Sequence, residues 1–193
     1  PGVAGIVLVG SNGTFSAGAD IREFGTPEMI RGPSLWTLNA LLDDLHKPVV
    51  AAIEGMALGG GLELAMSCHH RVALASARIG LPEVKLGLLP GAGGTQRLPR
   101  LIGVEGALNV MLSGEPLPVA LFAKSPLFDK VVETDLVDAA VAVAEASAAA
   151  LRGGKPLPRA RDRKVKEPDL QALCQFARNT AKTGPNTSSC ASV

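Results

Sequence analysis

Two glutamates are the residues of this sequence with the clearest potential for chemistry. Glu63 follows three consecutive glycines and one leucine, and Glu83 comes twenty residues later in the sequence Leu81-Pro82-Glu83. A pair of carboxylates can activate a water molecule and deliver a proton within one reaction. Each glutamate alone has an ordinary explanation, because acidic residues are favoured in the first turn of a helix and loop carboxylates are usually solvated.

Glycine-rich turns accompany both glutamates. Gly59-Gly60-Gly61 lets the backbone approach a ligand closely, and the helix formers from Leu62 to Cys68 predict a helix that begins there with free N–H groups. Such groups can stabilise a developing oxyanion. Gly91 lies in a second glycine-rich turn, where its ordinary role would be a turn residue with positive φ. The three features indicate a reaction site only in combination.

Other arrangements of reactive residues are less convincing. Cys68-His69-His70 is a poor metal site, because adjacent side chains point in different directions and no second ligand pair follows, so no metal is expected. Ser16 lies in no Gly-x-Ser-x-Gly turn, which argues against a serine hydrolase. With five Phe, one Trp and no Tyr, the chain lacks the stacking aromatics of a single-strand nucleic-acid binder.

The pattern of apolar residues predicts an α/β fold, because short strands alternate with helices. Strands are expected at Val3 to Gly10, buried on both faces, at Val49 to Ile53 and at Arg71 to Ala75. The helix expected from Ser34 to His46 is capped by Ser34 and carries an apolar side made of Leu35, Leu38, Leu41, Leu42 and Leu45. Further helices are expected at Thr95 to Leu98, limited by Pro99, at Val104 to Leu112, at Asp138 to Leu151 and at Asp169 to Lys182, before an unstructured end from Thr183 to Val193.

Charge and composition divide the chain into a core, residues 1–151, and a basic linker and tail, residues 152–193. Residues 1–150 carry 10 Lys and Arg against 15 Asp and Glu, whereas residues 151–193 carry 9 against 3. A basic tail could meet phosphates of a nucleotide or of nucleic acid, although a solvated linker is the commoner case. No apolar run approaches the roughly 20 residues that span a membrane. Three cysteines without metal-ligand spacing favour a reducing, cytoplasmic location.

Three segments in the correct order and spacing resemble the crotonase, or enoyl-CoA hydratase/isomerase, superfamily. They are Phe15-Ser16-Ala17-Gly18-Ala19-Asp20-Ile21, Ala57 to Ala65, and Leu81 to Leu98. This resemblance covers roughly residues 1–150 and is far more specific than a lone glycine motif. It implies a spiral of repeated ββα units followed by C-terminal helices, from which the family's opening segment is missing in this chain.

The resemblance also implies the roles of individual residues. The backbone N–H groups of Ala19 and Gly60 would hold the thioester carbonyl, and Glu63 and Glu83 would hold a water molecule between them. Gly91 would help to position that water or a carboxylate through its N–H. The coenzyme A moiety would lie near Ala17, Asp20, Ile21 and Arg22, of which Arg22 could equally be an ordinary surface cation.

The implied activity is hydration of trans-2-enoyl-CoA to 3-hydroxyacyl-CoA in fatty-acid β-oxidation, with no cofactor beyond the coenzyme A of the substrate. The alternatives are a Δ3,Δ2-enoyl-CoA isomerase and a catalytically idle module that binds acyl-CoA or RNA. The sequence from Arg159 to Lys164 resembles the linker that joins the hydratase half of bifunctional β-oxidation enzymes to a 3-hydroxyacyl-CoA dehydrogenase. Family members commonly form trimers or hexamers, although the fused enzymes often do not.

Overall fold

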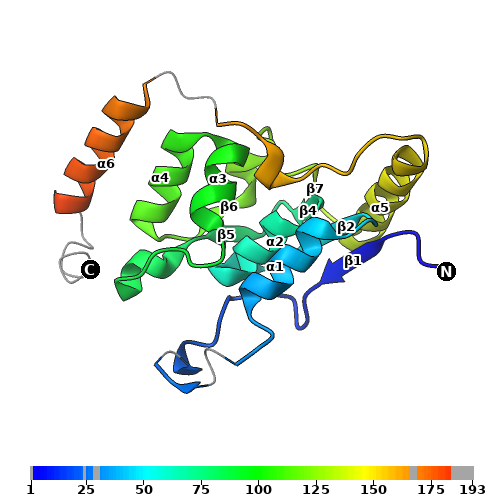
Figure 1. The fold of residues 1–193 in the computed structure, drawn as a ribbon, viewed down its shortest axis with the longest axis horizontal. Coiled ribbons are helices and arrows are strands. Elements are labelled where there is room, and N and C mark those ends of the chain that lie inside the picture. Colours follow the sequence, from blue (N-terminus) through cyan, green and yellow to red (C-terminus); the bar gives the residue numbers. More distant parts are fainter. Residues whose placement is uncertain (1, 24, 28–30, 166–168, 184–193) are drawn as a thin grey trace.

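The computed structural model describes residues 2–23, 25–27, 31–165 and 169–183, and these form an α/β structure (Figure 1). Strands lie at β1 Ile6–Val9, β2 Val49–Ile53, β3 Met56–Leu58, β4 His70–Leu74, β5 Arg78–Gly80, β6 Leu117–Pro118 and β7 Lys130–Val132. The α-helices are α1 Leu35–Asp44, α2 Gly60–Ser67, α3 Gly94–Ile102, α4 Val104–Ser113, α5 Leu136–Arg152 and α6 Leu170–Thr183. Short 3-10 helices lie at η1 Ile21–Glu23, η3 Pro82–Leu86, η4 Val119–Phe122 and η5 Ala160–Asp162.

The strands form two sheets. Four parallel strands follow the order β1-β2-β4-β7, and three strands follow the order β3-β5-β6, with β3 and β5 parallel and β6 antiparallel. Every residue of β2 is buried, as expected for a parallel strand that is covered on both faces. Strand β2 therefore forms the centre around which the other elements are arranged.

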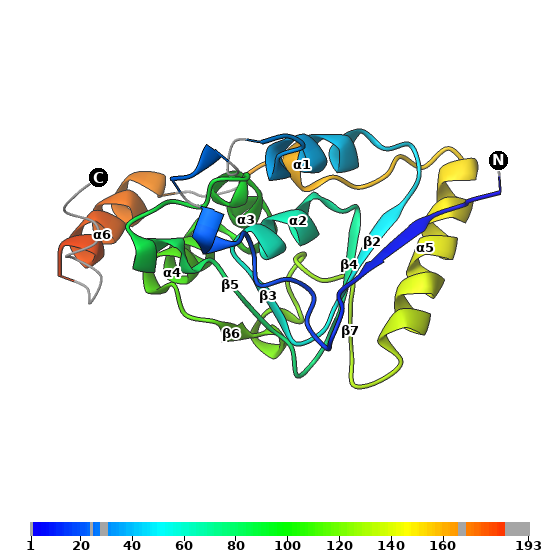
Figure 2. The same cartoon turned by 90° about the horizontal axis from the view of Figure 1, so that it is seen from below.

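The two faces of β2 meet different helices. Because successive side chains of a strand point to opposite faces, Val49, Ala51 and Ile53 belong to the main core with residues of α2. Val50 and Ala52 instead pack with residues of α5 in a second cluster. Figure 2 shows α5 on one side of the strands and α1 and α2 on the other.

The chain repeats a strand-strand-helix unit, as predicted. Strands β2 and β3 lead into α2, and strands β4 and β5 lead through η3 into α3. Since consecutive units place equivalent strands side by side, β2 pairs with β4 and β3 pairs with β5. This pairing brings helix α2 of one unit and the η3 turn of the next unit to the same region. Helix α2 carries Glu63 and η3 carries Glu83.

Three expectations about individual elements were wrong. Strand β1 pairs with β2 alone among the described strands, and its residues are only half-buried, with Val9 55% exposed. Helix α1 is capped by Ser34, whose hydroxyl accepts from the Thr37 amide at 3.3 Å, but its buried residues are Asn39, Leu42 and Asp43. Helix α3, expected as a short helix from Thr95 to Leu98, instead runs through Pro99 to Ile102 and is followed by Gly103, where φ is +82°.

The basic segment after residue 151 is not separate from the core over its whole length. Ala160 of η5 is buried in the main cluster, and η5 packs against α3. The predicted helix near residue 170 is α6, while residues 184–193 of the predicted unstructured end lie outside the described residues. Within the described residues, no helix has the length and hydrophobicity needed to cross a membrane.

Candidate active site around Glu63 and Glu83

Glu63 is a buried carboxylate held by backbone amides. It lies in the first turn of α2 and is 2% exposed. Its Oε1 accepts hydrogen bonds from the amides of Ala92 at 2.8 Å and Gly94 at 2.7 Å. Burial raises the pKa of Glu63, while these two hydrogen bonds and the positive charge of Arg97 act in the opposite direction. With Oε1 occupied by the two amides, Oε2 is the atom of this carboxylate that remains for a ligand.

Glu83 is a second carboxylate, half-buried and in a different environment. It lies in η3, directly after Pro82, where the 3-10 turn follows strand β5. Its Oε2 is buried without a hydrogen-bond partner among the described residues. Burial, with a further contribution from the charge of Glu63, raises the pKa of Glu83 to about 6. A carboxyl group with this pKa can exchange a proton close to neutral pH.

Gly59 makes room for the Glu83 side chain. A methyl group at Gly59 would lie 3.1 Å from Oε1 of Glu83, and Gly59 has φ of +52° and ψ of −126°, a conformation that residues with a side chain rarely adopt. The Gly59 amide donates to the carbonyl of Gly80 in β5. The first glycine of the three therefore joins the start of α2 to the chain segment that carries Glu83.

The backbone nitrogens of Ala19 and Gly60 lie close together, while their role as donors to a thioester carbonyl stays a prediction. A methyl group at Gly60 would lie 3.7 Å from the Ala19 nitrogen, and one at Gly18 would lie 3.3 Å from the Gly60 nitrogen. Ser16 pairs with β3, since its amide donates to Met56 and its carbonyl accepts from Leu58. This pairing holds the turn that contains Ala19 beside the start of α2, and two neighbouring N–H groups that face one ligand atom can stabilise an oxyanion.

Backbone amides from the second glycine-rich turn reach Glu63, but they belong to residues that the sequence did not single out. The hydrogen-bonded amides are those of Ala92 and Gly94, one and three residues after Gly91. Gly94 has no side chain, and a methyl group there would lie 3.0 Å from Oε1 of Glu63. The role of Gly91 in positioning water stays a prediction.

The residues predicted to contact coenzyme A lie on the surface next to Ala19. Asp20 and Arg22 form an exposed salt bridge of 2.5 Å, which lowers the pKa of Asp20 through the hydrogen bonds from Arg22. Ile21 is exposed and Ala17 is likewise exposed. Their position at the turn is compatible with the predicted role, while the ion pair also gives Arg22 a structural partner.

An apolar cavity of about 410 Å³ lies beside η3. It is adjacent in the chain to Glu83, because Val84 contributes to its wall. The remaining lining comes from the turn before α3, from α3 and α4, and from α6, through Gly87, Leu88, Leu89, Pro90, Thr95, Leu108, Met111, Leu112 and Ala181. Cavities of this size and character accommodate apolar parts of small ligands.

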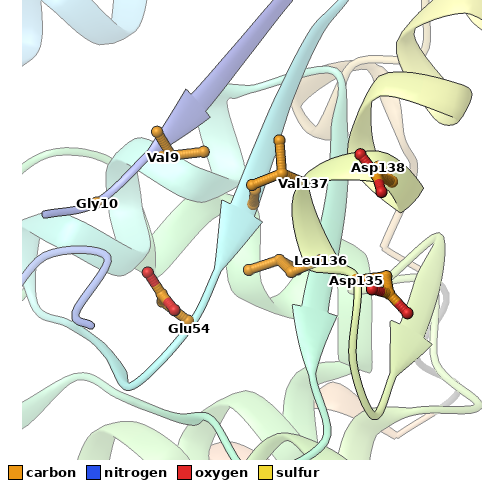
Figure 3. A pocket seen from close by; sticks show the side chains of 8 residues that line it. Val9, Gly10, Glu54, Asp135, Leu136, Val137 and Asp138 are labelled. Atoms are coloured by element: carbon orange, nitrogen blue, oxygen red, sulfur yellow. The ribbon is translucent and has the colours of Figure 1, made fainter. Parts of the chain in front are cut away.

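A different pocket, of about 330 Å³, lies at the carboxyl ends of strands β1 and β2 (Figure 3). Strands β1 and β2 and the start of α5 line it, and Figure 3 shows the carboxylates of Glu54, Asp135 and Asp138 around it. None of the predicted site residues contributes to this pocket. Its acidic lining would repel a phosphate-bearing ligand such as coenzyme A.

The residues Cys68-His69-His70 have structural contacts. His69 Nδ1 accepts from the Val49 amide at 3.1 Å, and burial lowers the pKa of His69 to about 4. His70 contacts Asp129 at 2.7 Å and Ser147 at 2.9 Å. Burial raises the pKa of the Cys68 thiol to about 12, so this thiol is not a reactive thiolate. Among the described residues, no group of three or more side chains could hold a metal ion.

Comparison with known proteins identifies the relatives of this chain. The model of the enoyl-CoA hydratase/isomerase family matches residues 1–188. The peroxisomal bifunctional enzyme of Danio rerio is 49% identical over 157 residues, which are 81% of this chain and 21% of the relative. A peroxisomal fatty acid beta-oxidation multifunctional protein of Arabidopsis thaliana is 48% identical over 136 residues, which are 67% of this chain and 19% of the relative. The chain thus spans about a fifth of the length of these relatives.

The fold is also found in solved structures. The enoyl-CoA hydratase of Bacillus anthracis superimposes with a TM-score of 0.68 at 30% sequence identity, covering 98% of this chain and 74% of that protein. The expectation of a crotonase-like fold is confirmed. The expected cytoplasmic location is wrong, because the relatives are named as peroxisomal or glyoxysomal enzymes. Free cysteines indicate a reducing compartment but do not identify which compartment it is, so they could not support a cytoplasmic location.

Proposed function

Because the chain belongs to the enoyl-CoA hydratase/isomerase family, we propose that it adds water across the double bond of trans-2-enoyl-CoA to give 3-hydroxyacyl-CoA. The observation that carries this proposal is the pairing of the buried Glu63 with the half-buried Glu83, two carboxylates close enough for the charge of Glu63 to raise the pKa of Glu83. A single carboxylate would suffice for shifting a double bond, whereas holding and splitting a water molecule uses both.

In the proposed reaction, Glu63 accepts a hydrogen bond from the water through Oε2 while its Oε1 stays fixed by two amides. Glu83 removes a proton from this water as its oxygen bonds to C3 of the substrate. The electrons of the double bond then move toward the thioester carbonyl and form an enolate. Glu83 returns the proton to C2, so that the elements of one water molecule are added and both carboxylates are restored.

The amides of Ala19 and Gly60 are the proposed donors to the enolate oxygen. The proximity of their nitrogens supports the assignment, because donors that the fold already places side by side need little reorganisation when the negative charge develops. The unpartnered Oε2 of Glu83 supports the proton-transfer role, since a buried acceptor without a protein partner is available to a bound water.

The apolar cavity beside Glu83 is the proposed site of the acyl chain. Its wall follows η3 directly, so a substrate with its C2 and C3 atoms at Glu83 can extend its tail between α4 and α6. The coenzyme A portion would leave the site on the side of Ala17, Asp20, Ile21 and Arg22. This chain would act as the hydratase part of a larger enzyme, which the names bifunctional and multifunctional of its relatives support. The resemblance of residues 159–164 to a linker suggests 3-hydroxyacyl-CoA dehydrogenase as the second activity.

Two parallel assays on the same preparation test the proposal. One follows the loss of the conjugated thioester absorbance of crotonyl-CoA, and the other follows the conversion of 3-enoyl-CoA. We expect hydration of crotonyl-CoA at a rate well above isomerisation. Isomerisation without hydration would support the alternative isomerase function, and binding of acyl-CoA without either reaction would show an idle module.

A further inference from the structure

In the turn before α3, two amides point toward Glu63 and the carbonyl between them points away from it. The amides of Ala92 and Gly94 donate to Glu63 Oε1, and the carbonyl of Ala92 lies between them in the chain. This carbonyl points to other partners, accepting from Asn39 Nδ2 at 3.0 Å and from Arg97 Nη1 at 3.1 Å. The Ala92 carbonyl belongs to the peptide group between these two amides, so the hydrogen bonds that hold it restrict the backbone torsions on both sides and help to keep the two amides facing Glu63.

Arg97 forms a fork between this turn and helix α1. Its Nη1 donates to the Ala92 carbonyl, while its Nη2 donates to Asp43 Oδ2 at 2.6 Å. Both side chains of this ion pair are buried. A planar guanidinium can make these two bonds in fixed directions at once, which a lysine ammonium on a flexible stem cannot reproduce.

The basic tail contacts the same pair from the outside. Arg161 of η5 donates to Asp44 Oδ1 at 2.6 Å and lies 3.7 Å from Asp43 Oδ2. The neighbouring Ala160 is buried in the core, which anchors the segment. A continuous series of polar contacts therefore runs from the tail, through α1 and Arg97, to the turn that holds Glu63.

We propose that Arg97 is a positioning residue for Glu63, an assignment that rests on the proposed hydratase function. Together with Asn39 it fixes the carbonyl of Ala92, and the two flanking amides then face the carboxylate. Asp43 holds the guanidinium of Arg97, and Arg161 secures Asp43 from the tail. The segment that leads out of the core thus supports the geometry of the reaction site.

The arrangement is costly for a purely structural contact. Asn39 Oδ1, Asp43 Oδ1 and Arg97 Nε are all buried without a hydrogen-bond partner among the described residues. Apolar residues of similar volume often stabilise a fold at least as well as a buried ion pair does. These buried polar groups are explained if they maintain the geometry of the turn and do not serve to stabilise the fold.

The decisive variant is Arg97→Lys, which keeps the charge opposite Asp43 but loses the fork. We expect kcat for crotonyl-CoA hydration to fall by about 10- to 100-fold, because small displacements of a reacting group have effects of this size. KM should change little, since Arg97 does not contact the substrate. Arg161→Gln should lower kcat less. The matched control is Arg100→Gln, one turn along α3, whose Nη1 donates to Gln96 instead of Ala92 and which should keep wild-type kcat and KM.

A second measurement does not depend on turnover. The amide NMR signals of Ala92 and Gly94 report their hydrogen bonds to Glu63, and we expect Arg97→Lys to shift both toward their positions in Glu63→Gln. Asn39→Leu, which removes the other donor to the Ala92 carbonyl, should shift the same two signals and supplies the test if Arg97→Lys does not fold. Folded variants with unmoved amide signals would overturn the proposal. An inactive wild-type chain would instead refute the hydratase function, while the NMR comparison would still decide the positioning role.

Discussion

Glu63 and Glu83 differ in the hydrogen bonds of their carboxylates: Glu63 accepts from two backbone amides, whereas Glu83 has a buried oxygen without a partner among the described residues. This difference gives the two side chains different tasks. A carboxylate fixed by amides is suited to holding a water in place, and one that is poorly solvated in its charged form is suited to taking up a proton.

Replacing Glu83 by Gln keeps the size of the side chain and removes the base. We expect kcat for crotonyl-CoA hydration to fall by at least about 10²- to 10⁴-fold, the usual contribution of general acid-base catalysis. Binding of the acyl-CoA, measured by calorimetry, should be nearly unchanged. The control is Glu115→Gln, which removes an exposed partner of Lys85. Near-wild-type turnover by the Glu83 variant would remove Glu83 from the mechanism.

The raised pKa of Glu83 predicts the pH dependence of the reaction. Since the charged form acts as the base, kcat/KM should rise with pH through a midpoint near 6. A pH-rate profile of the free enzyme measures this midpoint. A midpoint at the ordinary glutamate value of 4.5 would mean that burial does not perturb Glu83 as the structure indicates.

The same pKa predicts an effect on stability with the opposite pH trend. A folded-state pKa near 6 against an ordinary 4.5 means that the folded protein binds this proton more tightly. The contribution to stability is therefore full below about 4.5 and is lost as pH rises through about 6. Above that pH, Glu83→Gln should increase the free energy of unfolding, because the neutral amide removes a charge that burial disfavours. Denaturant titrations at pH values on both sides of this window measure the difference, and a Gln variant less stable at high pH would contradict it.

Gly18 tests the proposed oxyanion donors. Gly18 has φ of +100°, and a methyl group there would lie 2.9 Å from the Leu58 carbonyl and 3.3 Å from the Gly60 nitrogen. We expect Gly18→Ala to displace the Ala19 amide and to lower kcat by about 10²- to 10³-fold, the usual effect of losing one such donor.

Gly13 is the matched control for Gly18. It also has positive φ, at +71°, but a methyl group there would meet nothing within 4 Å. Both substitutions should lower the free energy of unfolding by about 1–2 kcal/mol through backbone strain, while only Gly18→Ala should impair kcat. Equal loss of kcat in both variants would indicate a general effect on folding rather than on the donors.

Much of the fold could be predicted from the sequence because its elements depend on local patterns. The run of apolar residues from Val49 to Ile53 matches β2 at both ends, and Ser34 caps α1 as expected. The buried side of α1 could not be predicted from the leucine spacing. Asn39 and Asp43 are buried where they contact Ala92 and Arg97. These partners come more than fifty residues later in the chain, so the local sequence around α1 does not reveal them.

The site shows the same division between local and distant information. The motif places both glutamates and the glycines that surround them, and the structure brings those segments together. A glycine-rich turn does not reveal which of its amides face inward, so Ala92 and Gly94 could not be distinguished from Gly91. The role of Arg97 depends on its simultaneous contacts with α1 and with the turn, which no spacing in the sequence indicates.

The apolar cavity predicts how acyl chain length affects the reaction. Met111 lines this cavity on α4, and Met111→Phe should narrow it with little effect on the reacting atoms. We expect kcat/KM for long-chain enoyl-CoA to fall by about tenfold or more, in line with the effect of poorly fitting methylenes, while crotonyl-CoA is hydrated normally. The control Leu121→Phe changes an exposed residue outside the cavity. An equal decrease for both substrates would place the acyl chain elsewhere.

The most direct test is the fate of water during turnover. The chain is incubated with crotonyl-CoA in isotopically labelled water, and the product is analysed by mass spectrometry and NMR. The predicted result is 3-hydroxybutyryl-CoA with labelled oxygen at C3, formed by the wild type and lost in both Glu63→Gln and Glu83→Gln. Unlabelled crotonyl-CoA recovered from a folded wild-type chain, or labelled product formed equally by the two variants, would contradict the account.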